Sequence, residues 1–217
     1  MGAHGGTGRV SARTVDAYAA AMSELELPAA SGSGAPVTYL LVDGENVDAT
    51  LGLSVLGHRP SPEQRPRWER VRSYVADWGV PVKALFFLNA SRGELPASFV
   101  QALMAMEFRP VPLSGDAHEK VVDIGIQRTL DAIAERPGNV VLLSHDADFV
   151  PQLKALLGPG RRVAVVGFPE FVSTRIKALT QDGLQIVDVE TEVRAFNTLL
   201  PRVRIIPLEE FDPAPFL

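Results

Sequence analysis

Acidic residues follow two apolar segments of the chain at the points where β-strands are expected to end. Residues 37–42 run directly into Asp43, and residues 140–143 lead into Asp146 and Asp148. Carboxylate oxygens are ligands that Mg²⁺ and Mn²⁺ prefer, and such a metal can activate water and stabilise a leaving oxygen at a phosphodiester. If the two strands are neighbours, these positions predict a hydrolytic metal site.

A fourth acid, Asp123, lies near the start of a helix expected at residues 119–136, with apolar neighbours on both sides. Burying a carboxylate in such surroundings is costly unless a cation or hydrogen-bond donors meet it. The predicted catalytic residues and metal ligands are therefore Asp43, Asp123, Asp146 and Asp148. The place of Asp123 depends on its helix turning inward, and Asp148 could serve both as a ligand and as a helix cap.

Each of these acids also has an ordinary structural interpretation. An Asp-Gly pair after a strand is common in turns, and Asp43 or Asn46 could cap a helix. Asp123 and Asp148 could be acids that favour a helix N-terminus. The metal-site interpretation rests on their joint position, because ligands of a doubly wound sheet bind outside the carboxyl ends of the strands, where the strand order reverses.

Strands and helices are expected to alternate from residue 37 onward. The expected strands are 37–42, 82–88, 109–113, 140–143, 162–166 and 184–187, and the expected helices are 62–78, 96–106, 119–136, 148–157, 171–181 and 191–199. Two prolines in 109–113 suit a strand at a sheet edge. Strands that are apolar on both faces and separated by helices predict a three-layer α/β/α fold with a mostly parallel, doubly wound sheet.

The length of 217 residues suits one α/β domain with extensions. We expect that domain at residues 37–200. A flexible N-terminal extension, residues 1–36, would contain a short helix at 14–27, and residues 201–217 would form a C-terminal tail that lies over the surface or hangs free.

The composition excludes several kinds of protein. The chain contains no cysteine, which rules out disulfide scaffolds, thiolate metal sites and cysteine nucleophiles. No stretch predicts a membrane span or a signal peptide, so we expect a soluble, cytoplasmic protein. No phosphate-binding loop, dinucleotide-binding glycine motif or zinc-type histidine spacing is present. The formal net charge of −5 argues against a simple nucleic-acid clamp, but less against a hydrolase whose acids hold cations.

The acidic motifs, taken in order, resemble the NYN family, a branch of the PIN-like nucleases. The matching segments are LLVDGENV at 40–47, KVVD at 120–123, LLSHDADFV at 142–150 and GRRVAVVG at 160–167. The resemblance covers about residues 37–190. It implies the PIN-like α/β/α fold, Mg²⁺ or Mn²⁺ bound by the aspartates, and cleavage of RNA.

The resemblance also implies roles for particular positions. Asp43, Asp123, Asp146 and Asp148 correspond to the acidic residues of the family, and Asn46 and Ser144 correspond to polar helpers that would contact substrate. His145 departs from the family pattern, which more usually has Gly-Asp before the second acid. Its imidazole could contact substrate or face solvent, and we expect it to face solvent.

Asn89, Arg92 and Lys120 are further candidates for substrate contacts near the same edge, although the statistics of isolated polar side chains favour an ordinary solvated surface residue at each position. The expected function is a metal-dependent endoribonuclease with RNA as its substrate. The alternatives are a catalytically weak or inactive PIN-like module that binds RNA or protein in a regulatory complex, and a phosphatase or nucleotide hydrolase. A homodimer or a protein partner could use the terminal extensions, and no membrane is expected.

Overall fold

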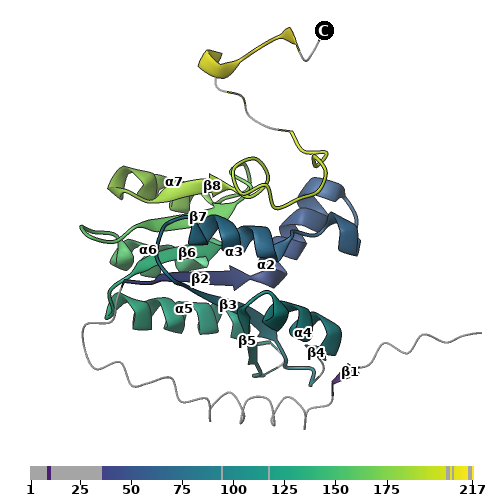
Figure 1. Cartoon of the computed structure of the whole chain (residues 1–217), viewed down its shortest axis with the longest axis vertical. Helices are drawn as coiled ribbons and strands as arrows, with labels where there is room; N and C mark the ends of the chain where they lie inside the picture. The colour runs from purple at the N-terminus through teal and green to yellow at the C-terminus, as the bar shows by residue number, and fades with distance from the viewer. Residues whose placement is uncertain are drawn as a thin grey trace, which may run out of the picture.

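The fold is a single parallel sheet between two layers of helices (Figure 1). The computed structural model describes residues 9–10, 36–93, 95–116, 118–203, 206, 208–214 and 217. The helix expected at 14–27 lies outside the described residues. None of the helices in this part of the chain is long and apolar enough to cross a membrane.

The main strands are β2 (Thr38–Asp43), β3 (Val82–Asn89), β5 (Phe108–Leu113), β6 (Asn139–Leu143), β7 (Val163–Gly167) and β8 (Gln185–Asp188). The α-helices are α2 (Gly44–Ala49), α3 (Trp68–Ala76), α4 (Ala97–Ala105), α5 (Val121–Ala134), α6 (Val150–Leu156) and α7 (Thr174–Ala178). A π-helical segment, η1 (Thr50–Leu56), continues α2, and 3-10 turns lie at η2 (Pro62–Gln64), η3 (Ala147–Phe149), η4 (Leu179–Asp182) and η5 (Leu208–Glu210). A two-residue strand, β1 (Arg9–Val10), pairs antiparallel with β4 (Leu95–Pro96).

The strand order is β5–β3–β2–β6–β7–β8, and every pair in this sheet is parallel. From β2 the chain adds β3 and β5 on one side, and from β6 it adds β7 and β8 on the other side. The strand order therefore reverses between β2 and β6. Their pairing runs from Thr38 opposite Asn139 to Val42 opposite Leu143. The predicted doubly wound α/β/α fold is therefore confirmed, and the ends of β2 and β6 flank the switch point where such sheets bind ligands.

Each face of the sheet has its own hydrophobic core, because alternate strand residues point to opposite faces. Leu40 and Val42 pack on the face covered by α2, η1, α3 and α4, whereas Leu41 packs on the face covered by α5, α6 and α7. All three side chains are fully buried. The edge strand β5 contains Pro110 and Pro112, as the sequence predicted.

The helix expected at 62–78 is interrupted. Its first turn is η2, and α3 begins only at Trp68, because Pro66 disfavours helical backbone at the residue before it. Arg65 is accordingly extended, with φ −78° and ψ 156°.

The closing helix expected at 191–199 is absent, since residues 191–199 form turns and irregular backbone. The side chain of Asp188 accepts hydrogen bonds from the N–H groups of Glu190 and Thr191, at 2.7 and 3.2 Å. Arg194 then adopts a positive φ of 56°. A side chain that binds the following backbone groups offers them an alternative to helical pairing, which the apolar spacing could not reveal.

Candidate metal centre

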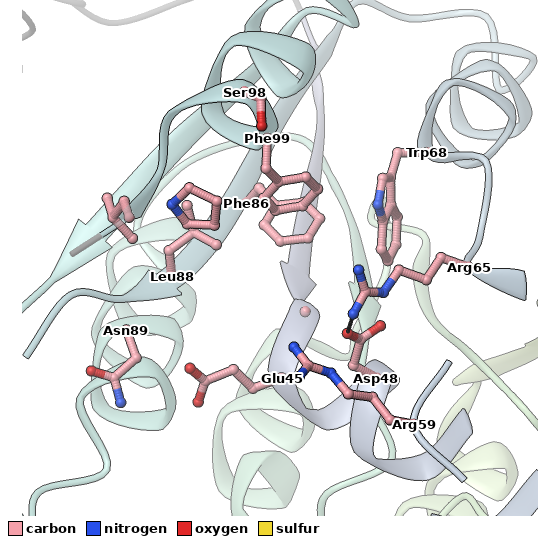
Figure 2. A pocket seen from close by; sticks show the side chains of 13 residues that line it. Glu45, Asp48, Arg59, Arg65, Trp68, Phe86, Leu88, Asn89, Ser98 and Phe99 are labelled. Carbon is pink, nitrogen blue, oxygen red and sulfur yellow. Dashed lines mark ion pairs between the residues drawn. The ribbon is translucent and has the colours of Figure 1, made fainter. Parts of the chain in front are cut away.

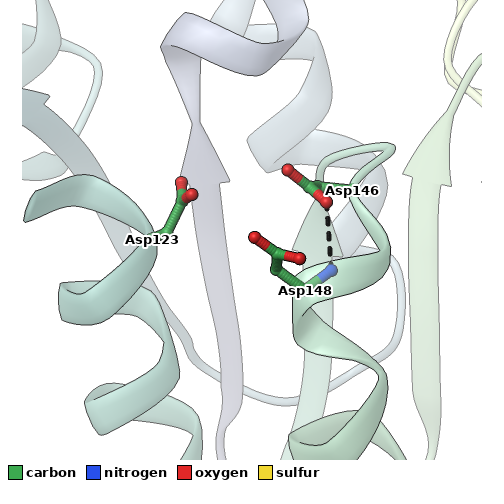
Figure 3. A group of neighbouring side chains, drawn as sticks. All are labelled: Asp123, Asp146 and Asp148. Carbon is green, nitrogen blue, oxygen red and sulfur yellow. Dashed lines mark hydrogen bonds between the residues drawn. The ribbon is translucent and has the colours of Figure 1, made fainter. Parts of the chain in front are cut away.

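Three carboxylates converge beyond the carboxyl ends of β2 and β6 (Figure 3). One oxygen each from Asp123, Asp146 and Asp148 lies within 4.8 Å of the others. Asp123 comes from α5, and the other two come from the segment between β6 and α6. Oxygens that share one Mg²⁺ lie about 3 to 4 Å apart, so small side-chain rotations would let all three reach one hard cation.

The start of α5 directs Asp123 toward this cluster. The helix begins at Val121, so Asp123 is in its first turn, while Val121 and Val122 are buried against the sheet. Burial raises the pKa of Asp123; Lys120 lowers it, and the charges of Asp146 and Asp148 raise it further. The inward turn that the sequence analysis required is therefore present.

The loop after β6 is held by its own carboxylate. Asp146 caps η3, because its Oδ1 accepts a hydrogen bond from the N–H of Asp148 at 3.0 Å. Asp148 lies in the first turn of η3 and is not its N-cap, so of the two helix roles considered for it the structure has that of a first-turn acid. Gln127 of α5 donates to the backbone carbonyl of Asp148 at 3.1 Å and ties the loop to that helix.

Asp43 lies outside this group of three and is more deeply buried, with 2% of its surface exposed. Its Oδ1 accepts a hydrogen bond from the N–H of Asn46, and its Oδ2 accepts one from the hydroxyl of Ser144, both at 3.1 Å. Burial raises the pKa of Asp43 to about 6; the two hydrogen bonds oppose this change, and the charge of Asp123 adds to it. Whether Asp43 ligates a metal stays a prediction.

Ser144 orients the acids and does not reach solvent. Its side chain is fully buried, and its hydroxyl donates to Asp43 while accepting a hydrogen bond from the N–H of Asp146 at 3.3 Å. The expected contact between Ser144 and substrate stays a prediction, while in this structure its hydroxyl is fully buried and bonded within the protein. The residue links the end of β2 to the loop after β6.

His145 and Asn46 form a second link between these strand ends. Asn46 Oδ1 accepts hydrogen bonds from His145 N–H and from Nδ1, at 2.9 and 2.8 Å. The N–H of Phe168 donates to Nε2 at 2.9 Å, which leaves the imidazole neutral with its proton on Nδ1. Burial lowers the pKa of His145 to about 4, in agreement with that neutral form.

The expectation that His145 faces solvent is wrong: it is 6% exposed and stacks on Phe168, with ring centroids 5.7 Å apart. Gly167 makes room for this ring, because a Cβ at that position would lie 2.8 Å from Nε2. The imidazole thus fastens the ends of β2, β6 and β7 to one another beneath the acidic loop.

Lys120 places a positive charge among the acids. Its Nζ lies 2.9 Å from Asp148 Oδ2 and 3.3 Å from Asp123 Oδ2. The hydrogen bond to Asp148, followed by the one to Asp123, raises the pKa of Lys120. The side chain is 66% exposed and can leave the site without disturbing the core. Lys120 therefore neutralises part of the negative charge of the three-carboxylate cluster.

The chain matches the NYN domain family over residues 37–183, more than half of its length. The chain belongs to the NYN domain family. This family is one of PIN-like nucleases, so the expected resemblance is confirmed and the acidic cluster falls in a nuclease domain.

Among solved structures, this NYN domain is similar to a protein of unknown function from Vibrio parahaemolyticus, with a TM-score of 0.55 and 22% sequence identity. The match covers 72% of this chain and 94% of that one, and it shows a shared fold. A search of curated proteins gives no significant match.

The remaining predicted substrate residues of the NYN domain lie beside the cluster without joining it. Asn89 is the last residue of β3 and Arg92 follows it; both are exposed, and their contacts with substrate stay predictions. Glu45 is an acid that the sequence analysis did not select. Burial and the charge of Asp123 raise its pKa, whereas Asn89 and Arg92 lower it. Glu45 could have been selected from the sequence, because it lies two residues after Asp43 in the same motif.

The buried carboxylate of Asp43 should make the metal-free NYN domain less stable at neutral pH. The folded state holds this proton up to about pH 6, whereas the unfolded chain releases it near pH 3.8, so stability falls as the pH rises through that window. Asp43→Asn cannot ionise. In EDTA we expect it to be more stable than wild type at pH 7.5, by on the order of 2 kcal/mol, with the difference shrinking toward zero at pH 4.

Urea unfolding at the two pH values measures this difference. Asp131→Asn, an exposed position on the same domain, is the matched control and should show no such pH dependence. A variant at Asp43 that is no more stable than wild type at pH 7.5 would contradict the unfavourable burial of this carboxylate.

Proposed function

We propose that the protein is a metal-dependent endoribonuclease that hydrolyses RNA phosphodiester bonds with Mg²⁺ or Mn²⁺. The observation that carries the proposal is the convergence of Asp123, Asp146 and Asp148 at the switch point of a NYN domain. These three would hold the cation, and Asp43 is proposed as a further ligand. An all-oxygen donor set suits hard cations of this kind.

A bound cation of this type would activate a water molecule and stabilise the leaving oxygen. The protein supplies the orientation. Ser144 fixes Asp43 and the backbone of Asp146, and Asp146 in turn fixes the backbone of Asp148. Because these bonds and the His145 contacts come from packed strand ends, the carboxylates are held before substrate arrives.

Basic side chains near the acids would contact phosphate. Lys120 is exposed and already bridges two of the carboxylates, so a cation in the cluster would displace its ammonium group toward solvent. There it could meet the phosphate backbone, and Arg92 is exposed on the β3 side of the site. These contacts would offset the repulsion between RNA and a chain of net charge −5.

A circular single-stranded RNA tests the proposal, because it has no ends and only an endonuclease can open it. Purified protein should linearise the circle with Mg²⁺ or Mn²⁺, stop in EDTA, and resume when excess metal is restored. A DNA circle and mononucleotides, tested in parallel, define the substrate. An intact RNA circle under all metal conditions, with mononucleotides turned over instead, would replace the proposal with a nucleotide hydrolase.

The ion pairs of Lys120 favour a second candidate, a catalytically weak or inactive module that binds RNA or a protein. An internal ammonium can neutralise the cluster without a metal. That candidate predicts RNA binding with no cutting and no heat of Mn²⁺ binding in calorimetry. The endoribonuclease predicts the opposite result for both measurements.

A further inference from the structure

A groove of about 680 Å³ lies beside the strand end that carries Asp43 (Figure 2). Its lining includes Gly44 and Glu45, which directly follow Asp43, and it continues between β3, α3 and the start of α4. The volume is within the range of small-molecule sites. The groove therefore starts at the N-terminal end of α2, next to Asp43, and Asp123, Asp146 and Asp148 do not line it.

One wall of the groove is aromatic. Trp68 and Phe86 meet edge to face with ring centroids 5.0 Å apart, and Phe86 meets Phe99 in the same way at 5.5 Å. Gly44 lets the backbone approach this wall, because a Cβ there would lie 2.5 Å from Phe86. Trp68 and Phe86 are 6% and 2% exposed, so the half-buried Phe99 offers most of the ring surface against which a planar group can lie.

The opposite part of the groove is charged and has an unused hydrogen-bond donor. Figure 2 shows Arg59, Arg65 and Asp48 together, away from Phe99 and Ser98. Arg65 pairs with Asp48 at 2.9 Å through its terminal nitrogen. Its Nε is buried and has no hydrogen-bond partner among the described residues. A buried donor of this kind is costly to leave unpaired, and a water molecule or a ligand atom that reaches it would satisfy it.

We propose that this groove binds one nucleotide of single-stranded RNA, next to the bond that is cleaved. The proposal rests on the proposed function and adds a substrate subsite to it. The base would lie against the aromatic wall, and the arginines would meet its phosphate and its acceptor atoms. A base stacked in a duplex cannot enter a recessed groove without unpairing, so the groove selects unpaired RNA.

Tryptophan fluorescence can report binding in this groove directly. The chain has two tryptophans, Trp68 in the groove wall and Trp78 beneath the guanidinium of Arg162 at 3.7 Å. In Trp78→Phe, the remaining signal comes from Trp68 alone. A single-stranded RNA hexamer, titrated in EDTA at low ionic strength, should quench that signal saturably without being cut.

Two pairs of variants in the Trp78→Phe background locate the binding. Ser98→Phe fills the groove, whereas Gln101→Phe places the same ring on an exposed part of α4 outside it. Arg59→Gln removes a charge from the groove, and Arg128→Gln removes one from an exposed part of α5. The groove variants should weaken RNA binding about ten-fold, and each control should stay within about two-fold of the parent.

The outcomes separate this proposal from the proposed function. Unchanged affinity in Ser98→Phe, or quenching by a peptide of residues 207–217 but not by RNA, would overturn the nucleotide subsite. RNA that quenches Trp68 and is never cut with Mn²⁺ would leave the subsite standing and overturn the nuclease. RNA that is cut without quenching Trp68 would leave the nuclease standing and overturn the nucleotide subsite.

Discussion

Asp146→Asn is expected to lower the rate of metal-dependent RNA cleavage by at least about 100-fold while leaving the fold intact. The substitution removes one of the three converging carboxylate charges. An asparagine oxygen can still accept the hydrogen bond that Asp148 N–H gives to Asp146, so the loop should keep its shape. Single-turnover cleavage of circular RNA measures the loss, and circular dichroism with thermal unfolding checks the fold.

Asp131→Asn provides the matched control, because it makes the same change of charge at an exposed position further along α5. It should cut RNA at the wild-type rate. If Asp146→Asn also cuts at that rate, the three-carboxylate cluster is not the catalytic centre.

The second large effect is expected at Arg202, whose guanidinium is held by three carboxylates at the carboxyl ends of β7 and β8. It forms ion pairs with Glu170, at 2.6 Å, and with Asp188 and Glu190. The Arg202 side chain is 1% exposed, and its guanidinium lies over the ring of Phe168, 5.1 Å from the centroid. The other neighbours of that ring include His145, so this network reaches the base of the metal centre.

Arg202→Ala would leave the three carboxylates buried without their cation. Breaking a buried pair in this way typically costs about 3 to 5 kcal/mol, because the remaining charge is uncompensated. For a chain of this size we expect the melting temperature to fall by roughly 10 °C. Arg202→Lys keeps the charge but loses the planar fork of donors, so its loss should be intermediate.

Arg128→Ala is the control, since an exposed arginine usually contributes no more than about 0.5 kcal/mol. Thermal unfolding of the three variants at pH 7.5 makes the comparison. An equal melting temperature for Arg202→Ala and Arg128→Ala would show that the network does not hold this end of the chain to the sheet.

Local sequence patterns sufficed for the parts of the fold that depend on local properties. The apolar segments that become β2 and β6 are short and lead straight into acids, and the prolines of 109–113 marked an edge strand. The convergence of Asp146 and Asp148 at the switch point followed from a general rule of doubly wound sheets. Asp123 joined them because apolar neighbours on both sides turn its helix inward.

Features that depend on contacts between distant segments could not be predicted. His145 is buried because Gly167 and the N–H of Phe168 make room and a partner for it, and both lie more than twenty residues away. Asp43 and Asp146 were the firmest predicted pair, because both follow strand ends, yet the depth of Asp43 sets it apart from the cluster of three. The groove is likewise built from Trp68, Phe86 and other residues whose nearness only the folded chain reveals.

Isothermal titration calorimetry with Mn²⁺, on the wild type and on Asp146→Asn, tests the central claim most directly. We expect saturable binding to the wild type and a loss of that heat in the variant. Mn²⁺ should also raise the melting temperature of the wild type alone, since a ligand at 100 times its Kd stabilises the folded state by about 2.7 kcal/mol. A wild type with neither heat nor a shift at millimolar Mn²⁺, or a variant that binds equally well, would contradict a metal centre at these aspartates.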